Sequence, residues 1–278
     1  MRNSLCRTAI AAALALGSLL PLAADEPPVA PVTLEYAPAA NQVDQRYLRV
    51  DIKDILITDA STGMTGSATA EVKLTVTTVT ADTATLRGEI SKLSQRMAGH
   101  ALPSTPPKPM VLQADRRARL LQAPAQESQA PGEILSQGGL PIQALTVICC
   151  LPQLPDKPVA PGDTWQRQDT YDMPGLGKTS LAITTTFLGM QQGVAMLRST
   201  IRVSVPDFQA DNPLLPGQQI TIHNLVVEAT DLLQQYDPER SAVLQAAGNL
   251  KASLEANGPD MTMPVKLVAA VNYRPLGP

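Results

Sequence analysis

The stretch that decides the fold is VKLTVTTVTADTATLRGEI, residues 72–90. Valine and threonine dominate it, and β-branched residues favour strands because they pack well on a pleated surface. Ala81-Asp82 stands at its centre and fits a tight turn between two strands. The stretch therefore predicts a β-hairpin, and it indicates an all-β protein with at most a minor α-helical part.

A second hairpin is predicted at residues 181–201, LAITTTFLGMQQGVAMLRSTI. It belongs to a series of segments that match one another in the same order along the chain. The pairs are Leu86-Arg87 with Leu197-Arg198, DRRARLLQA (115–123) with DPERSAVLQA (237–246), and PIQALTVICCLP (141–152) with PVKLVAAVNYRP (264–275). This order predicts a divergent internal repeat, residues 46–152 and 163–278, that forms a curved antiparallel sheet or half-barrel. The halves either share one core or pack as two small domains, with residues 153–162 as the linker.

The first 24 residues have the three parts of a secretory signal peptide. Arg2 and Arg7 form a basic start, residues 10–20 are apolar, and Leu22-Ala23-Ala24 offers a small-residue cleavage site. No later run approaches the roughly 20 apolar residues that a membrane span needs. We therefore expect an exported protein, periplasmic or extracellular, with a Pro/Ala-rich leader at residues 25–45 and no transmembrane span.

The composition excludes several classes of partner. Removal of the signal takes away two arginines and moves the formal charge from −3 to −5. The chain has no basic patch that could follow a phosphate backbone, so we expect no nucleic-acid partner. Only two cysteines are left after this removal, which is too few for a disulfide framework. The core must therefore be hydrophobic.

Cys149 and Cys150 are the candidates for a redox or metal centre. If residues 141–152 form a strand, side chains alternate across it. Cys150 then points into the core as a small hydrophobe and Cys149 points outward. Free or partly oxidised strand cysteines are the favoured interpretation, a strained vicinal disulfide near Pro152 is the second, and a metal role is the third. A lone Cys-Cys pair lacks further ligands at typical spacing, so we expect no metal and no cofactor.

A turn before the second half supplies further structural residues. In the sequence Ala160 to Asp163, Pro161 can preset the first corner of a type II turn and Gly162 can supply the positive φ at the second. Trp165 follows as the only tryptophan, and we expect it to be a buried anchor against the sheet.

The same segment carries a resemblance. Pro158 to Trp165, together with DPERS at residues 237–241, resembles a family of exported bacterial proteins of unknown function. That family shares a Pro-Val-x-x-Gly-Asp-Ser/Thr-Trp segment and a late Asp-Pro-Glu-x-Gly-like turn, and Ser241 stands where it often places glycine. The resemblance covers mainly the second half of the chain and implies a fold rather than an activity.

Residues 240–256, RSAVLQAAGNLKASLEA, have two interpretations. Their composition favours a helix by intrinsic propensity. Gly248 in the middle and the position of the segment in the repeat favour a strand, which is our prediction.

The remaining chemistry-bearing residues fit no catalytic motif. They are His100, His223, the pair Met261 and Met263, the acids Asp163, Asp169 and Asp172, and the phosphate-loop-like PGLGKTS (174–180). The histidines have no patterned nucleophile nearby, and the spacing of the phosphate loop fails. The methionines indicate an apolar face rather than a Cu(I) site, and the acids indicate a solvated loop.

Three functions follow from these patterns. The first is a non-enzymatic exported β protein that binds an apolar ligand on a concave face or an envelope partner. The second is a structural or interaction module of the cell envelope, with Pro-rich loops and sheet edges as contact surfaces. The third, and least favoured, is a hydrolase with paired loop carboxylates. A cavity of roughly 300 Å³ or more would favour a ligand, whereas a filled core would favour the interaction module.

Overall fold

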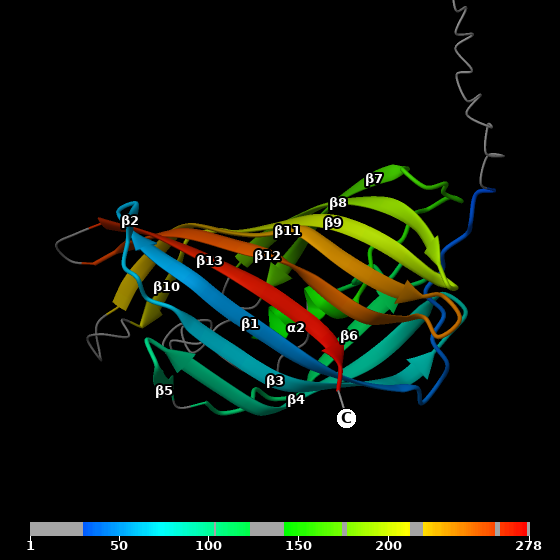
Figure 1. Ribbon diagram of the computed structural model, residues 1–278, viewed down its shortest axis with the longest axis horizontal. Helices are drawn as coiled ribbons and strands as arrows, with labels where there is room; N and C mark the ends of the chain where they lie inside the picture. The colour runs from blue at the N-terminus through cyan, green and yellow to red at the C-terminus, as the bar shows by residue number, and fades with distance from the viewer. Residues whose placement is uncertain are drawn as a thin grey trace, which may run out of the picture. The chain divides into compact units, whose positions relative to one another are not determined.

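The fold is dominated by one antiparallel sheet (Figure 1), seen in a computed structural model that describes residues 30–102, 104–122, 142–173, 177–211, 219–258 and 262–276. Within these ranges the sheet has 13 strands and is accompanied by one helix, α2 (Ile142–Cys150). The strands are β1 (Val43–Ile57), β2 (Ala60–Ser61), β3 (Gly66–Val79), β4 (Thr83–Met97), β5 (His100–Leu102), β6 (Met110–Asp115), β7 (Thr164–Met173), β8 (Gly177–Gln191), β9 (Val194–Val205), β10 (Phe208–Asp211), β11 (Gln219–Asp237), β12 (Ala242–Asn257) and β13 (Thr262–Pro275). The all-β prediction is confirmed.

The strand order follows from successive hairpins. The main path of the sheet runs β5-β4-β3-β1-β13-β12-β11-β9-β8-β7, with β2, β6 and β10 paired at its side. The first long strand, β1, pairs with the last, β13, so the two ends of the strand sequence meet in the middle of the sheet. The predicted halves therefore lie on either side of this junction. Both hairpins read from the sequence are present, as β3–β4 and β8–β9.

The core lies on one face of this sheet because apolar side chains alternate along the strands. In β3, Ala68, Ala70, Val72, Leu74 and Val76 are all buried, and the residues between them are more exposed. One hydrophobic cluster takes residues from both predicted halves, and Pro31–Pro278 forms one compact unit. The halves share one core rather than forming two small domains.

The sheet is curved, it contains β-bulges, and α2 lies on its inner side. In β11, Asp231 has a φ of 51° and the pairing with β12 shifts register between Thr230 and Leu233. Bulges bend a strand and increase its twist. The sheet curves around α2, which lies against its inner face (Figure 1). Gln234 of β11 holds the helix by donating from its side-chain amide to the carbonyl oxygens of Ile148 and Cys149, both at 3.3 Å.

The helix corrects one prediction directly. Residues 142–150 form α2 and not a strand, so the alternation that placed Cys149 outward and Cys150 inward does not exist. Both thiols are buried. The helix has apolar side chains on most of its sides, because the inner face of the sheet encloses it. A segment that is apolar all round shows no periodicity by which a helix could be distinguished from a strand.

The described part of the predicted leader, residues 30–45, and the predicted linker both pack against the sheet. Val32 bridges to Val159 through two backbone hydrogen bonds of 2.8 and 2.9 Å. Leu34 and Tyr36 are buried, as is Leu154 in the linker segment. β1 already begins at Val43, within the predicted leader. The predicted signal peptide lies outside the described residues.

The repeat agrees with the structure in part. The two chain reversals at Asp115 and Asp237 are built alike, because one carboxylate oxygen of each aspartate accepts two backbone N–H groups of the residues that follow. The last matched pair differs, since residues 142–150 are helical and residues 262–275 form β13. The repeat through residue 152 is therefore wrong in its final segment and otherwise stays a prediction.

Residues 242–257 form strand β12, so the strand prediction for the ambiguous segment is confirmed. Gly248 faces the bulge of β11, where a Cβ atom would stand 2.9 Å from the Cα of Leu232. The glycine that argued against a helix is thus needed for the close approach of two strands. Within the described residues, no helix has the length and apolar character to cross a membrane.

Ser241 provides a first testable prediction. It has a φ of 47° and its hydroxyl accepts the Ala37 N–H at 2.9 Å. The alanine variant loses this hydrogen bond and keeps the left-handed backbone, whereas the glycine variant loses the bond but relieves the backbone. We expect Ser241→Gly to be more stable than Ser241→Ala by about 1 kcal/mol in urea unfolding. Equal stability of the two variants would show that the backbone at this turn is not strained.

Candidate functional site

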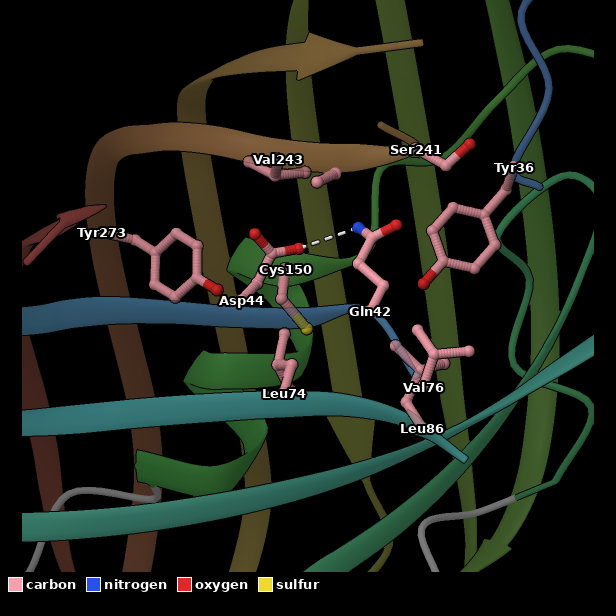
Figure 2. Close-up of a pocket in the computed structure, with 11 residues that line it drawn as sticks. Tyr36, Gln42, Asp44, Leu74, Val76, Leu86, Cys150, Ser241, Val243 and Tyr273 are labelled. Atoms are coloured by element: carbon pink, nitrogen blue, oxygen red, sulfur yellow. Dashed lines mark hydrogen bonds between the residues drawn. The ribbon is translucent and has the colours of Figure 1, made fainter. Parts of the chain in front are cut away.

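The candidate site is a small cavity beside the C-terminal end of α2. It measures about 20 Å³ and opens next to the Cys150 thiol. Figure 2 shows Tyr36 and Tyr273 on opposite sides, with Cys150 and the Gln42–Asp44 pair between them. Its lining is formed by Tyr36, Gln42, Asp44, Leu74, Val76, Leu86, Cys150, Ser241, Ala242, Val243 and Tyr273. A water molecule needs roughly 10–15 Å³ of such volume, so the cavity has the size of a water site.

Asp44 is the charged group of this cavity. Its carboxylate pairs with Arg46 at 3.0 Å and with Arg240 at 3.4 Å, and it accepts the Gln42 side-chain amide at 3.1 Å. Arg46 is buried and donates to the Val243 carbonyl oxygen at 3.3 Å. Because two cations and an amide already satisfy the carboxylate, it is suited to join β1 to the β11–β12 turn. It is poorly suited to act as a general base.

The thiols are held in their neutral form by their surroundings. Burial raises the pKa of Cys149 from 9.0 to about 12, and burial with the nearby Cys149 raises the pKa of Cys150 well above its usual range. Burial likewise raises the pKa of Tyr36 and Tyr273. The thiolate is the reactive form of cysteine. The arrangement therefore makes both cysteines inert packing groups.

This inertness can be tested by alkylation. In the native protein at pH 8 we expect neither Cys149 nor Cys150 to react with iodoacetamide, and both to react after unfolding, because the thiolate is absent in the core. Mass spectrometry counts the adducts. Rapid labelling of the folded protein would contradict the buried placement.

The same thiols predict a pH dependence of stability. Since their pKa values are raised in the folded state, they contribute stability below pH 9, and the free energy of unfolding should fall as the pH rises from there towards 12.

A second cavity lies on the other side of α2. It measures about 30 Å³ and is lined by Leu120, Val147, Ile148, Leu151, Gln153, Arg167, Tyr171, Leu181, Ile183 and Ile201. Its polar part is a network on β7. Arg167 donates to the Gln153 side-chain oxygen at 2.6 Å and to the Tyr171 hydroxyl at 3.0 Å, and it pairs with Asp169. The Tyr171 hydroxyl donates to the Leu120 carbonyl oxygen at 3.1 Å.

β7 is also an open edge of the sheet. Among the described residues it pairs with β8 alone. The Phe187 N–H bonds to the Asp163 carbonyl oxygen at 2.9 Å, which marks the pairs of odd-numbered β7 residues as the hydrogen-bonded ones. Because these pairs alternate along an antiparallel ladder, Gln166, Gln168 and Thr170 direct their N–H and C=O groups away from β8. Their side chains are exposed too.

The turn before β7 has the expected parts. Gly162 has a φ of 93°. The Asp163 N–H donates to the Ala160 carbonyl oxygen at 3.0 Å and so closes the turn that contains Pro161 and Gly162. The Asp163 carboxylate accepts the Ala160 N–H at 2.8 Å. Trp165 is half-buried against the core and donates its indole N–H to the Gln153 carbonyl oxygen at 3.1 Å.

The other candidates are not brought together. His100 is exposed on β5, and His223 on β11 lies 2.7 Å from Asp207. Asp169 points to the inner side of β7, whereas Asp172 is exposed at its end. Met261 and residues 174–176 of the phosphate-loop-like segment lie outside the described residues. In the part of the chain that the structure describes, no three metal-binding side chains gather into a group.

Neither a protein-family model nor a curated protein matches this sequence. The resemblance based on Pro158–Trp165 therefore stays a prediction. Sequence reasoning missed the Asp44 cluster, whose partner Arg240 is 196 residues away. It also missed the Arg167–Asp169 pair, because the acids at residues 163–172 were interpreted as a solvated loop. That interpretation was wrong for Asp169 and Asp172, which lie on strand β7.

Proposed function

We propose that this chain is an exported, non-catalytic β protein that binds an envelope partner protein through the open edge of its sheet. The observation that carries the proposal is the position of α2. The helix occupies the inner face of the curved sheet, where a carrier would hold an apolar ligand. The cavities beside it measure about 20 and 30 Å³, whereas small-molecule pockets usually have roughly 300–1,000 Å³.

The edge of β7 supports the same proposal. An edge strand presents unpaired N–H and C=O groups that can bind an extended segment of another chain by adding a strand. β7 offers a stretch of ten residues for this, free of proline. The outward backbone groups of Gln166, Gln168 and Thr170 would supply the hydrogen bonds, and alternate side chains would supply the specificity.

The proposal is tested by site-specific photo-cross-linking in the cell. A photoreactive residue at Gln168 should give an adduct of defined mass with another polypeptide chain, identified by mass spectrometry. The matched control is Thr200, which is equally exposed but lies on the interior strand β9. Adducts at both positions, or at neither, would contradict edge-specific binding.

Native mass spectrometry separates this function from ligand transport. We expect the protein, isolated without detergent, to carry no small molecule. A reproducible lipid-sized mass released on unfolding would mean that α2 leaves the inner face in the loaded state. That result would favour the apolar-ligand function instead.

A further inference from the structure

In the sequence of β7, charged and aromatic residues stand at equal distances on either side of Gln168, and the two charges are of opposite sign. Arg167 precedes this residue and Asp169 follows it, and further out Trp165 corresponds to Tyr171. These four side chains lie on the inner side of the strand. Gln168 itself directs its backbone groups to the open edge, as derived above from the pairing of Asp163 with Phe187. A two-fold axis through Gln168 would therefore place Arg167 opposite the partner copy's Asp169, and Trp165 opposite the partner copy's Tyr171.

We propose that two copies of this chain pair through β7, antiparallel and with Gln168 opposite Gln168 of the partner copy. The proposal rests on the edge binding proposed above and names its partner as a second copy. The two Gln168 residues exchange both N–H···O=C bonds, and Gln166 does the same with the partner copy's Thr170. A two-fold interface of this kind uses the same surface on both copies, and the two sheets become continuous.

Charge complementarity fixes this register. In the proposed pairing Arg167 faces the partner copy's Asp169, and both such pairs occupy non-hydrogen-bonded positions, where side chains approach most closely. A slip of two residues in one direction would place Arg167 opposite Arg167, and in the other direction Asp169 opposite Asp169. A slip of one residue would put inner side chains opposite outer ones. One register alone satisfies the charges.

The same charges make the edge selective. Inward-pointing charged residues are a device by which proteins prevent indiscriminate pairing at sheet edges. An apolar strand that pairs with β7 would leave Arg167 and Asp169 with only each other as counter-charges. A strand with the opposite charge order gains two such pairs, and a second copy of β7 supplies that order.

A register-specific disulfide tests the geometry. Residues opposite each other in hydrogen-bonded pairs have Cα atoms about 5.5 Å apart, which a disulfide can span. Gln168→Cys should therefore form a cross-linked dimer on mild oxidation. Gln166→Cys is the matched control, equally exposed on the same strand, and should stay monomeric because its counterpart is Thr170. Cys149 and Cys150 are buried and do not interfere. Equal cross-linking of both variants would overturn the register.

A charge swap tests the energetics. In sedimentation velocity over a range of concentrations we expect a monomer–dimer equilibrium for the unmodified protein. Arg167→Asp and Asp169→Arg, each alone, create two like-charge pairs per dimer and should raise the dissociation constant by about tenfold or more. The double variant restores complementarity and should restore the dimer. Circular dichroism checks that each variant is folded.

Proline at the axis gives an independent check. Gln168→Pro removes the N–H at the centre of the interface and leaves the pairing with β8 intact, since that N–H points outward. It should abolish the dimer, whereas Gln168→Ala should retain it. An unmodified protein that stays monomeric at high concentration overturns the self-pairing. Cross-links from Gln168 to a different protein would in that case still support the proposed function.

Discussion

Replacing Gly248 with alanine is expected to destabilise the protein by about 3 kcal/mol, an overpacking cost at the upper end of the usual range. The new Cβ atom would stand 2.9 Å from the Cα of Leu232 and 3.2 Å from the Thr230 carbonyl oxygen. Both are backbone atoms of β11, so no side-chain rotation relieves the contact. The strand would have to move, and Leu232 on it is fully buried.

Urea unfolding followed by circular dichroism measures this effect. The matched control is Asn249→Ala, at the exposed neighbouring position of β12, which should change stability by less than about 0.5 kcal/mol. The bulge explains why the two variants should differ in stability, because Asp231 and Leu232 of β11 together lie opposite Gly248 of β12. Equal stability of the two variants would mean that β11 can flatten at this point at little cost.

Gly248 also illustrates what could be predicted from the sequence. The hairpins β3–β4 and β8–β9 were predictable because the strand composition and the short turn of each are local, within the continuous segments 66–97 and 177–205. For residues 240–256 propensity alone favoured a helix, which is wrong. The strand prediction rested on the position of the segment in the repeat and on Gly248. Its physical role, the approach of a bulge from a neighbouring strand, depends on sheet order and is not local.

The helix α2 shows why the cysteines were misplaced. Residues 145–151, LTVICCL, form an unbroken run of apolar and β-branched residues. Such a run is typical both of a strand and of a helix buried on all sides. Pro141 and Pro152 stand just outside its two ends, as proline often does for helices. That signal was available but competed with the repeat, which had assigned a strand. The enclosing sheet overrides the local preference for a strand.

The candidate cavity could not be predicted for a different reason. Asp44 and Tyr273 line it from β1 and β13, the first and last long strands, which the sheet pairs with each other. Arg240, which pairs with Asp44, comes from the turn between β11 and β12. Edge strands are equally non-local, because a strand is an edge only by its place in the sheet. The opposite charges at Arg167 and Asp169 of β7, by contrast, are visible in the sequence. They indicate a pairing surface only because β7 lies at the edge of the sheet.

Replacing Leu145 with alanine is the second change with a large expected effect. Leu145 is 3% exposed and anchors α2 in the hydrophobic core beneath the sheet. Truncation of a buried leucine usually costs about 3 kcal/mol, through lost burial and the cavity left behind. The helix has only nine residues, and short helices depend on packing rather than on their own propensity. We therefore expect the loss to loosen the whole of α2.

Two measurements separate loosening of the helix from simple loss of stability. Urea unfolding should show the loss for Leu145→Ala and almost none for Ala144→Gln, which is exposed on the same helix. Binding of an apolar dye under native conditions should rise in the first variant alone, since the inner face carries fully buried groups such as Leu232 and Phe187. A Leu145→Ala protein that loses stability without binding dye would place the loss in global unfolding. Dye binding well below the unfolding transition would instead identify α2 as the element that keeps an apolar ligand out, and so would explain in physical terms why edge binding is favoured over transport.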